Sequence, residues 1–415
     1  MKFCIFTLGS RGDVQPYIAL AKDLVQKGHS AVICTGESFK LLIEENGVLF
    51  HKTASDLMAI AGTPEGKAIL ENPVKNMKLA LRYSKEVINP AYRKTLDQFY
   101  EAAKDSDLII YHPKALGAVD IALRLQIPCV SMPPVPITYP VSEFPNMAVT
   151  FKNLGGLLNR LTYSLNTYAE RSQIEEINDF RVKTLGLEKR KPGIYTYSDG
   201  QKEIPTVYPI SPKLFPDVKS WNGHVFLPGF FYLDHNNESL SEELESFLST
   251  GSRPIAVTFS SMPLGDPKSF IMKLKKALTE TNNRGVLLVG NSGINCTSDA
   301  QLCVAESAPH ALLFERIKGV VHHGGIGTTA AALRAGIPQQ IIPFSTDQPF
   351  WANRLYKLGY CLKPLKEKKL TAADLVNSFH EMENPDRCSK AKEMAKDIRN
   401  ENGTANTIEY LETLT

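Results

Sequence analysis

Two histidines followed by glycines are the residues of this chain best suited to chemistry. Residues 319–329 read GVVHHGGIGTT, which predicts a buried strand, a tight turn and the start of a helix. Glycines let the backbone approach a ligand closely, and the first turn of a helix presents unpaired N–H groups. The turn has no acid, and His322 and His323 can both donate to oxygen atoms. This pattern favours an anion, most often a phosphate.

A second glycine turn, at residues 9–16, has the opposite chemistry. It reads GSRGDVQP and lies between an apolar strand and a helix that we predict from about residue 16 to residue 27. A carboxylate at Asp13 would repel a bound phosphate, so the phosphate is expected on the C-terminal turn. Asp13 is then expected to face a group that needs a base. Its position alone also fits a helix N-cap, a role that Asp often has.

Both turns follow strands within a repeated alternation of strand and helix. Apolar strands are predicted at residues 2–8, 31–34, 48–52, 107–111, 128–130 and 206–208, and then at 254–259, 286–289, 319–321 and 340–343. Such alternation predicts parallel sheets with helices on both faces. Residues 151–181 read as one amphipathic helix, and residues 133–147 as a long loop rich in proline.

The chain length and a loosened pattern near its middle predict two α/β domains. A chain of 415 residues is too long for one ordinary core. We therefore expect an N-terminal Rossmann-like domain at residues 1–225, a linker at 226–240 and a C-terminal Rossmann-like domain at 241–390. A C-terminal helix at 391–415 is expected to pack back on the N-terminal domain.

Composition narrows the class of protein. The chain has 43% hydrophobic and 22% charged residues, and its net charge of +3 is too small to indicate nucleic acid. Seven cysteines without a C-x-x-C pair fit reduced thiols in the cytoplasm. No apolar run reaches the length of about 18 residues needed to span a bilayer, and the N-terminal run is too short for a signal peptide. We expect a cytoplasmic protein that can contact a membrane peripherally.

Several weaker candidates compete with these two turns. A dinucleotide site would use Glu37 for a ribose, but Gly9 and Gly12 lack the G-x-G-x-x-G spacing. Asp105-Ser106-Asp107 has the D-x-D form of a divalent metal site, and it equally fits a polar loop that enters a strand. His112 follows that strand and has either a structural role or a place beside the ligand. No Cys/His spacing resembles a zinc site, and no metal site is expected.

Taken together, these residues resemble family 1 glycosyltransferases of the GT-B fold, in which two doubly wound Rossmann-like domains face each other across a cleft. They look closest to the branch with sterol glucosyltransferases and bacterial antibiotic glycosyltransferases. The resemblance covers both halves of the chain. Its N-terminal motif lies at residues 9–16 and 20–29, and its C-terminal motif at residues 309–310, 321–329, 336–338, 343–344 and 347–351.

The resemblance implies a role for each matched residue. Asp13 would be the general base that takes the proton of an acceptor hydroxyl, and Ser10, Arg11 and Gly12 would line its turn. Asp347 and Gln348 would bind sugar hydroxyls. The remaining residues implied to hold the nucleotide sugar are Ser260, Ser261, His310, His322, Gly324, Gly325, Gly327 and Thr328. Ser260 stands where the family usually has glycine.

The expected reaction is an inverting, metal-independent transfer of a hexose to a hydroxyl group. The expected donor is UDP-glucose, with no other cofactor. The acceptor is expected to be hydrophobic, such as a sterol, another lipid, a polyketide or a phenolic aglycone. An apolar stripe at residues 154–168 indicates either an acceptor pocket or ordinary core packing. The alternatives are a GT-B nucleotide-sugar epimerase, a nucleotide-sugar-binding protein without turnover and, more remotely, an NAD oxidoreductase.

Overall fold

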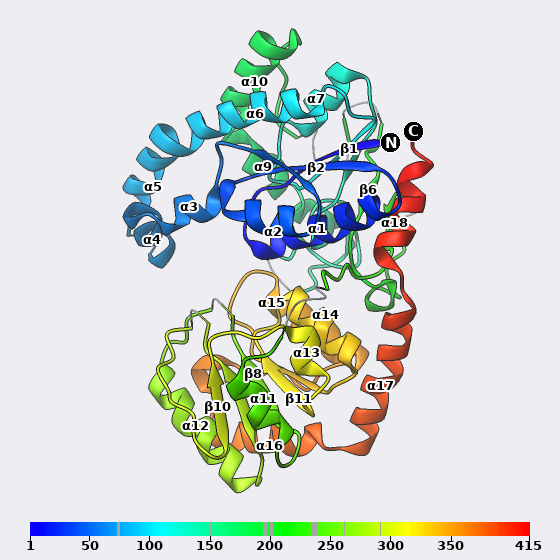
Figure 1. Ribbon diagram of the computed structural model, residues 1–415. Helices are drawn as coiled ribbons and strands as arrows, with labels where there is room; N and C mark the ends of the chain where they lie inside the picture. Colours follow the sequence, from blue (N-terminus) through cyan, green and yellow to red (C-terminus); the bar gives the residue numbers. More distant parts are fainter. Residues whose placement is uncertain are drawn as a thin grey trace. The chain divides into compact units, whose positions relative to one another are not determined.

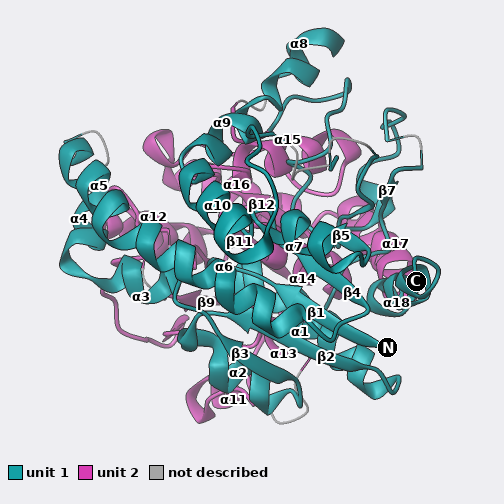
Figure 2. Cartoon of the chain, turned by 90° about the horizontal axis from the view of Figure 1, so that it is seen from above, with its two compact units in different colours: residues 1–146, 152–233, 402–415 teal, residues 147–151, 234–401 magenta. Residues whose placement is uncertain are grey.

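The computed structural model describes residues 1–72, 75–149, 152–193, 198–199, 202–221, 223–234, 239–260, 262–290 and 292–415. The chain forms two compact units, coloured teal and magenta in Figure 2. Unit 1 comprises residues 1–146, 152–233 and 402–415, and unit 2 comprises residues 147–151 and 234–401.

Unit 1 is built on a parallel sheet whose strand order, within the described residues, is β3-β2-β1-β4-β5-β6-β7. The strands are β1 (Lys2–Phe6), β2 (Ser30–Thr35), β3 (Leu49–Lys52), β4 (Leu108–Tyr111), β5 (Cys129–Ser131), β6 (Thr206–Val207) and β7 (Val225–Phe226). Side chains alternate across each strand, so Phe3 and Ile5 join the core with Val14 while Cys4 and Phe6 join the core with Phe99. Both faces of this sheet are therefore covered.

The helices of unit 1 flank this sheet. They are α1 (Arg11–Gln26), α2 (Lys40–Glu45), α3 (Leu57–Gly62), α4 (Pro64–Glu71), α5 (Met77–Tyr83), α6 (Asn89–Ala103), α7 (Ala118–Leu125), α8 (Gly156–Thr162), α9 (Leu165–Arg171), α10 (Ile174–Phe180) and α18 (Gly403–Glu412). Short helical turns lie at Glu37–Phe39, Ser84–Ile88, Arg181–Leu185 and Pro212–Leu214. Helix α1 begins at Arg11, earlier than the predicted start near residue 16, because Ser10 is its N-cap.

Unit 2 repeats the architecture with a parallel sheet in the order β10-β9-β8-β11-β12. The strands are β8 (Ile255–Thr258), β9 (Gly285–Leu288), β10 (Leu302–Ala305), β11 (Gly319–His322) and β12 (Gln339–Ile341). The helices are α11 (Glu242–Ser249), α12 (Pro267–Glu280), α13 (His310–Phe314), α14 (Ile326–Ala335), α15 (Gln348–Leu358), α16 (Ala372–Met382) and α17 (Pro385–Asn400), with a helical turn at Glu367–Lys369. Strand β10 was not among the predicted strands.

The C-terminal segment contains two helices rather than the single helix predicted at residues 391–415. Helix α17 ends at Asn400 in unit 2, and α18 begins at Gly403 in unit 1. A Cβ at residue 403 would lie 2.6 Å from the carbonyl oxygen of Phe230, so glycine is needed at this junction. Within unit 1, Glu412 of α18 pairs with Lys27 at 3.0 Å and with His29 at 2.9 Å. These contacts hold α18 beside α1 (Figure 1).

The predicted helix at residues 151–181 is wrong as a single helix, because this segment forms α8, α9 and α10 within its described residues, 152–181. Thr162 and Ser172 lie at the two breaks, where each hydroxyl hydrogen-bonds a carbonyl three residues earlier, over 2.5 Å and 2.8 Å. Such local bonds compete with a continuous helix.

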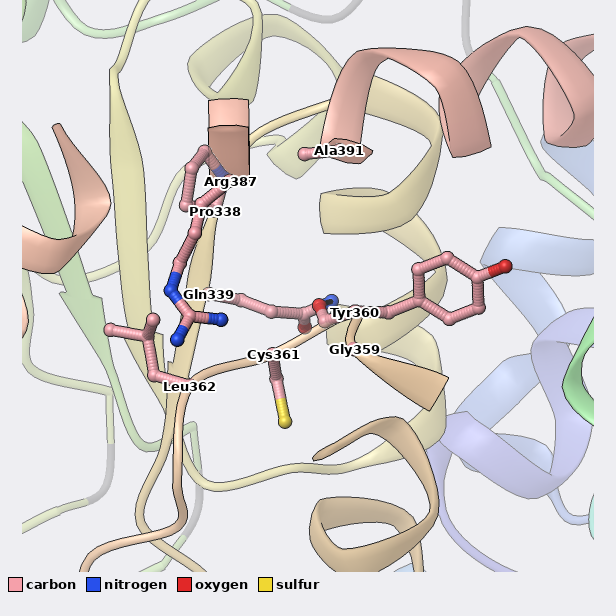
Figure 3. A pocket seen from close by; sticks show the side chains of 8 residues that line it. All are labelled: Pro338, Gln339, Gly359, Tyr360, Cys361, Leu362, Arg387 and Ala391. Atoms are coloured by element: carbon pink, nitrogen blue, oxygen red, sulfur yellow. Dashed lines mark hydrogen bonds between the residues drawn. The ribbon is translucent and has the colours of Figure 1, made fainter. Parts of the chain in front are cut away.

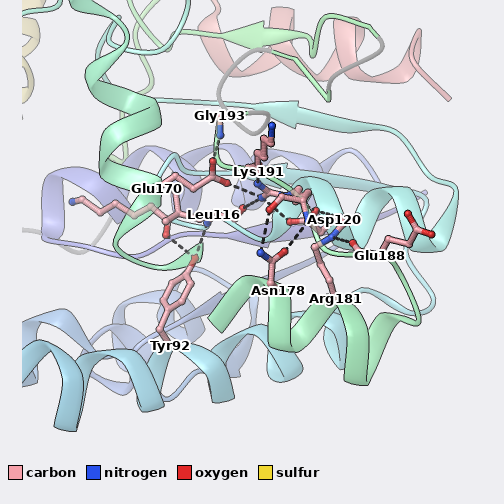
Figure 4. Close-up of polar contacts among 11 residues, drawn as sticks. Tyr92, Leu116, Asp120, Glu170, Asn178, Arg181, Glu188, Lys191 and Gly193 are labelled. Atoms are coloured by element: carbon pink, nitrogen blue, oxygen red, sulfur yellow. Dashed lines mark hydrogen bonds and ion pairs between the residues drawn. The ribbon is translucent and has the colours of Figure 1, made fainter. Parts of the chain in front are cut away.

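Buried charged side chains attach the segment that contains α8, α9 and α10 to helix α7, which flanks the sheet (Figure 4). Asp120 of α7 is fully buried and accepts from Arg181 and from Nε of Arg190, the latter at 2.8 Å. Arg190 also pairs with buried Glu170 of α9 at 2.7 Å. Burial raises the pKa of Glu170 even though Arg190 and the N–H of Gly193 oppose the shift. The network therefore ties α7, α9 and the residues after α10 together.

Candidate active site

The strand order of unit 1 reverses between β1 and β4. Chain connections leave these two neighbouring strands in opposite directions, and the carboxyl ends of strands at such a reversal are where α/β proteins commonly have a ligand-binding crevice. Phe6 at the end of β1 is in register with Tyr111 at the end of β4. The turn with Asp13 follows β1, and His112 follows β4. The sheet thus brings together two residues that lie 99 positions apart in the chain.

Asp13 is the centre of the hydrogen bonds at this crevice. Its Oδ1 accepts from Nε2 of His112 at 3.1 Å. Its Oδ2 accepts from the N–H of Ser10 at 2.7 Å, from the hydroxyl of Ser10 at 3.0 Å and from Nζ of Lys114 at 2.9 Å. A Cβ on Gly9 would lie 2.1 Å from this oxygen, and Gly9 also has a φ of +147°. Only glycine fits there.

The hydrogen bonds of His112 fix its tautomer. Its Nδ1 accepts the backbone N–H of Lys114 at 3.0 Å, so Nε2 carries the proton that is donated to Asp13. Burial lowers the pKa of His112, although Asp13 opposes this shift, so the imidazole is neutral near pH 7. Burial raises the pKa of Asp13, but contacts with His112 and Lys114 outweigh it, and the pKa lies well below its ordinary value. Asp13 is therefore a fixed carboxylate.

The remaining residues of the N-terminal turn have separate roles. The N-cap of α1 is Ser10, and Asp13 is the third helical residue, whose carboxylate bonds back to the N–H of Ser10. The N-cap role that its position suggested for Asp13 is therefore wrong: Asp13 contributes to the cap as the third helical residue of a capping box. Arg11 is exposed and donates to Gln15 at 3.0 Å, and Gly12 is exposed. Lys114 was missed because no sequence pattern singles it out; it lies three residues beyond the end of β4.

Unit 2 has a corresponding reversal between β8 and β11, where His322 is in register with Thr258. The predicted glycine turn leads directly from β11 into α14. Gly324 has a φ of +89°, and a Cβ there would lie 2.7 Å from Ile341. A Cβ on Gly325 would lie 2.4 Å from Nε2 of His323, whereas one on Gly327 would meet nothing within 4 Å. The first turn of α14 is thus open on the Gly327 side.

The N-terminus of α14 has the properties of an anion site. Its N-cap is Gly325, which provides no side-chain cap, and the first turn has no acidic residue. The earliest α14 amide that bonds within the helix is that of Thr329, to the carbonyl of Gly325 at 3.0 Å. Amides before it face the helix end together with the positive end of the helix dipole. The hydroxyl of Thr328 lies in this turn, and Thr328 is buried.

His322, the imidazole expected to hold the diphosphate, lies inside the unit with both ring nitrogens engaged. Its Nδ1 accepts the N–H of Gly324 at 3.1 Å, and its Nε2 lies 2.9 Å from Oε1 of Gln339. The amide nitrogen of Gln339 donates to the carbonyl of Tyr360 at 3.1 Å, so Nε2 of His322 is the donor to Oε1. Figure 3 shows Gln339 in the pocket formed with Tyr360 and Arg387. In this arrangement His322 shapes the turn, and its contact with a ligand stays a prediction.

His323 differs from its neighbour in having an unsatisfied atom. Its Nδ1 is buried and has no hydrogen-bond partner among the described residues. Burial lowers the pKa of His323, with a backbone hydrogen bond to Thr258 opposing the shift, and burial lowers that of His322 to about 3. Both imidazoles are therefore neutral near pH 7. The sequence had indicated both histidines as possible donors, and only the fold distinguishes them.

The other predicted donor residues of unit 2 lie at loop ends beside this turn. Asp347 is the N-cap residue of α15 and accepts from Nε1 of Trp351 at 2.8 Å, and Gln348 accepts the N–H of Phe344 at 2.8 Å. His310 begins α13 and stacks on Phe314 with ring centroids 4.7 Å apart.

Ser260 follows β8 and has a backbone conformation that favours glycine. Its φ is +56°, in the left-handed region that favours glycine. A Cβ on the neighbouring Gly290 would lie 2.6 Å from the carbonyl oxygen of Ser260, so the two backbones are close. Ser261, also predicted to bind the donor, lies outside the described residues.

The competing candidates have structural partners. Asp107 accepts the N–H of Lys2 at 2.7 Å, which joins β4 to the start of β1, and Glu37 pairs with Lys52 at 2.7 Å. Among the described residues, no three His, Cys, Asp or Glu side chains gather as metal ligands. Within that same part of the chain, every helix is too short or too polar to cross a bilayer.

Comparison with known proteins identifies the family. Residues 3–130 match the glycosyltransferase family 28 N-terminal domain, and residues 299–414 match the erythromycin biosynthesis protein CIII-like C-terminal domain. The sterol 3-beta-glucosyltransferase UGT80B1 of Arabidopsis thaliana is 30% identical over 99% of this chain and 67% of its own length. The chain belongs to the family 1 glycosyltransferases.

Other similarities agree with this membership. UGT80A2 of Arabidopsis thaliana, also named a sterol 3-beta-glucosyltransferase, is 32% identical over 98% of this glycosyltransferase, which spans 64% of the length of that relative. The crystal structure of the glycotransferase of kitacinnamycin superimposes with a TM-score of 0.72 at 16% identity, covering 100% of this chain and 98% of that one. The predicted family and the GT-B fold class of two doubly wound α/β halves are confirmed.

Proposed function

We propose that this glycosyltransferase moves glucose from UDP-glucose to a hydroxyl of a sterol or another hydrophobic acceptor. The observation that carries the proposal is the Asp13 carboxylate at the reversal point of unit 1. It is held ionised by His112 at 3.1 Å and Lys114 at 2.9 Å, and its side chain remains 21% exposed. A carboxylate that is fixed, ionised and reachable can accept the proton of a bound hydroxyl.

The donor half of the reaction is assigned to the N-terminus of α14. The leaving diphosphate carries negative charge, and the free amides of this turn together with the hydroxyl of Thr328 are suited to it. The unsatisfied Nδ1 of His323 offers one further polar contact. Asp347 and Gln348 are proposed to hold the sugar hydroxyls, as the family resemblance implies.

The proposed step is a single displacement. The acceptor oxygen attacks C1 of the glucose as its proton passes to Asp13, and the bond from C1 to the phosphate oxygen breaks. The electron pair of that bond leaves with UDP, whose charge is met by the α14 amides. Attack from the face opposite the leaving group inverts C1. Because fixed amides neutralise the leaving group in this scheme, it is proposed to proceed without a metal ion.

We propose that an exposed leucine surface in unit 1 brings the enzyme to its hydrophobic acceptor. It consists of Leu154, Leu157, Leu158, Leu161, Leu165 and Tyr168 on and around α8 and α9. These side chains are exposed, Leu157 for instance at 74%, whereas Tyr163 of the predicted stripe is buried. Core packing therefore applies to Tyr163 but not to the leucines. Between residues 152 and 171 the exposed charged residues are the bases Lys152, Arg160 and Arg171, while Glu170 is buried.

Apolar side chains interleaved with bases favour an anionic lipid surface. We therefore propose that the leucine surface contacts a membrane peripherally, where a sterol or lipid acceptor would be found. The test is sedimentation with vesicles that contain phosphatidylserine. An L157D/L161D variant should lose binding, whereas L41D/L49D should keep it, because Leu41 and Leu49 are exposed leucines elsewhere in unit 1 at 73% and 62%. Equal binding of the two variants would contradict the contact.

The test of the function itself is direct. The chain is incubated with radiolabelled UDP-glucose and a panel of sterols, phenols and polyketides, with and without EDTA. A glucoside product that forms equally with EDTA supports the proposal, and the anomer of the product tests inversion. Loss of product with EDTA would refute the metal-free step. Conversion of UDP-glucose into another sugar, without any acceptor product, would instead favour an epimerase.

A further inference from the structure

The carboxylate of Asp13 is fully occupied by donors of unit 1. A carboxylate offers roughly four acceptor positions on its two oxygens. In unit 1 the donors are Nε2 of His112 at 3.1 Å, the N–H and hydroxyl of Ser10 at 2.7 Å and 3.0 Å, and Nζ of Lys114 at 2.9 Å. A hydroxyl that is to give its proton to Asp13 must therefore displace one of these donors.

The four donors differ in how firmly they are held. The N–H and the hydroxyl of Ser10 belong to the N-cap residue that starts α1. His112 has a side chain that is only 4% exposed, and the N–H of Lys114 holds its far nitrogen at 3.0 Å. The ammonium of Lys114 stands at the end of a long side chain that is 47% exposed. Lys114 is the donor that can leave at the smallest structural cost, because water can solvate it outside the crevice.

We infer that the ammonium of Lys114 occupies Oδ2 of Asp13 until an acceptor hydroxyl displaces the ammonium. By keeping water from Asp13, Lys114 suppresses hydrolysis of the UDP-glucose donor. This inference rests on the proposed glycosyl transfer, and it makes Lys114 a positioning residue that acts through Asp13. An acceptor bound through its apolar body can place its hydroxyl against the carboxylate and exclude the ammonium. A lone water molecule lacks that binding energy and does not displace the ion pair.

The suppressed side reaction has defined chemistry. Water would give one proton to Asp13 while its oxygen attacks C1 of the glucose. The bond between C1 and the phosphate oxygen breaks, UDP leaves with the electron pair, and free glucose results. The same base and the same leaving group serve both reactions, so only access to Asp13 distinguishes water from an acceptor. Lys114 is the group that controls this access.

Other ionisable groups near Asp13 do not take this role. Tyr17 is fully buried and its hydroxyl donates to the carbonyl of Met132, and Arg11 donates to Gln15 at 3.0 Å. His112 faces Asp13 but stays in place through its second hydrogen bond. Of these groups, only Lys114 is a cation that both contacts Asp13 and reaches solvent. Substituting Lys114 therefore removes that cation and leaves the other groups in place.

The experiment compares two rates in one protein. Free glucose is measured with UDP-glucose alone, and glucoside is measured with UDP-glucose and a sterol. In a K114M variant the ratio of hydrolysis to transfer should rise by up to about fivefold, the effect of removing a partly exposed ion pair. The acid limb of the transfer rate should also move to higher pH, since Asp13 loses a stabilising cation. K114R, which retains a cation, should return the ratio toward that of the unsubstituted chain.

A matched control separates this effect from general disturbance. Lys27 is 44% exposed and pairs with Glu412 at 3.0 Å in the same unit, so K27M removes a similar ion pair away from Asp13. K27M should leave both rates unchanged. A ratio in K114M equal to that of the unsubstituted chain, with transfer intact, would overturn the inference about Lys114 alone. A chain that neither transfers glucose nor hydrolyses UDP-glucose would overturn the proposed function and this inference together.

Discussion

Nε2 of His112 donates to Oδ1 of Asp13 over 3.1 Å, and Nδ1 of the same ring is already taken by the N–H of Lys114. In the familiar pairing of these residue types, a carboxylate orients an imidazole that acts as the base. Here both ring nitrogens are used by the protein, so His112 cannot take a substrate proton without losing a contact. This geometry supports the proposal that Asp13 takes the proton and that His112 positions Asp13.

Replacing Asp13 should abolish turnover while preserving donor binding. D13N removes the negative charge that accepts the proton, so kcat for transfer should fall by a factor of about 10² or more. The affinity for UDP, measured by calorimetry, should change little because the proposed anion site belongs to unit 2. D23N is the matched control, since Asp23 lies on the same helix and instead accepts from Thr404. Unchanged turnover in D13N would remove Asp13 from the role of base.

Replacing His112 should make Asp13 a less effective base while leaving its carboxylate in the site. H112F deletes a hydrogen bond to a charged group, so kcat should fall by roughly 10- to 100-fold. The pKa of Asp13 should rise, because this contact lowers it, and the acid limb of the rate profile should move to higher pH. H29F serves as the control, because His29 also contacts a carboxylate, that of Glu412 at 2.9 Å. If H112F altered only thermal stability, the positioning role would be wrong.

Sequence patterns predicted most of the strands but not which strands would be neighbours. Apolar runs such as residues 2–8 and 319–321 predicted β1 and β11, and the glycines after them predicted both turns. The pairing of Asp13 with His112 depends instead on strand order, because β1 and β4 are neighbours although distant in sequence. The position of Lys114 near Asp13 depends on the same neighbourhood.

Burial was the second property that patterns could not supply. The histidines of the glycine turn look equivalent in sequence, and Gln339 on the adjacent strand is what engages His322. Likewise, the stripe at residues 154–168 has helical spacing that fits a core as well as a surface. Hydroxyl-to-backbone bonds at Thr162 and Ser172 divide it, and its leucines remain exposed.

The buried His322 predicts that unit 2 loses stability in acid. Burial lowers its pKa to about 3, against an ordinary value of about 6.5 in an unfolded chain. Between these pH values the unfolded chain binds a proton that the folded chain does not, so stability rises with pH over this window. The contribution is fully present above about pH 6.5 and is lost as the pH falls toward 3.

This acid sensitivity can be measured within one unit. The chain has two tryptophans, and Trp351 is fully buried in unit 2. A W221F background therefore leaves Trp351 fluorescence as the reporter of unit 2 in urea unfolding at each pH. Adding H322Q, which cannot be protonated, should flatten the dependence of the unfolding free energy between pH 6.5 and 4. An equally steep dependence in H322Q would show that other groups cause it.

Ser260 predicts a stabilising substitution. A side chain at a φ of +56° costs roughly 1–2 kcal/mol, and glycine regains part of this while losing about 0.5–1 kcal/mol of chain entropy. S260G should therefore raise the unfolding free energy of unit 2 by up to about 1 kcal/mol, again followed by Trp351. S260A keeps the strained backbone and should give no gain. The pair of variants also tests the hydroxyl, since both remove it from the donor side.

The charge network in unit 1 predicts a large and local loss of stability. Asp120 is fully buried between Arg181 and Arg190, and removing one partner of a buried ion pair typically costs about 3–5 kcal/mol. D120N should reduce the unfolding free energy of unit 1 by this amount, reported by Trp221 in a W351F background. D97N is the control: Asp97 pairs with Arg93 at 2.7 Å but is 46% exposed, so its loss should cost less than about 1 kcal/mol. Similar losses in the two variants would contradict the assignment of Asp120 as the anchor of the segment that carries the leucine surface.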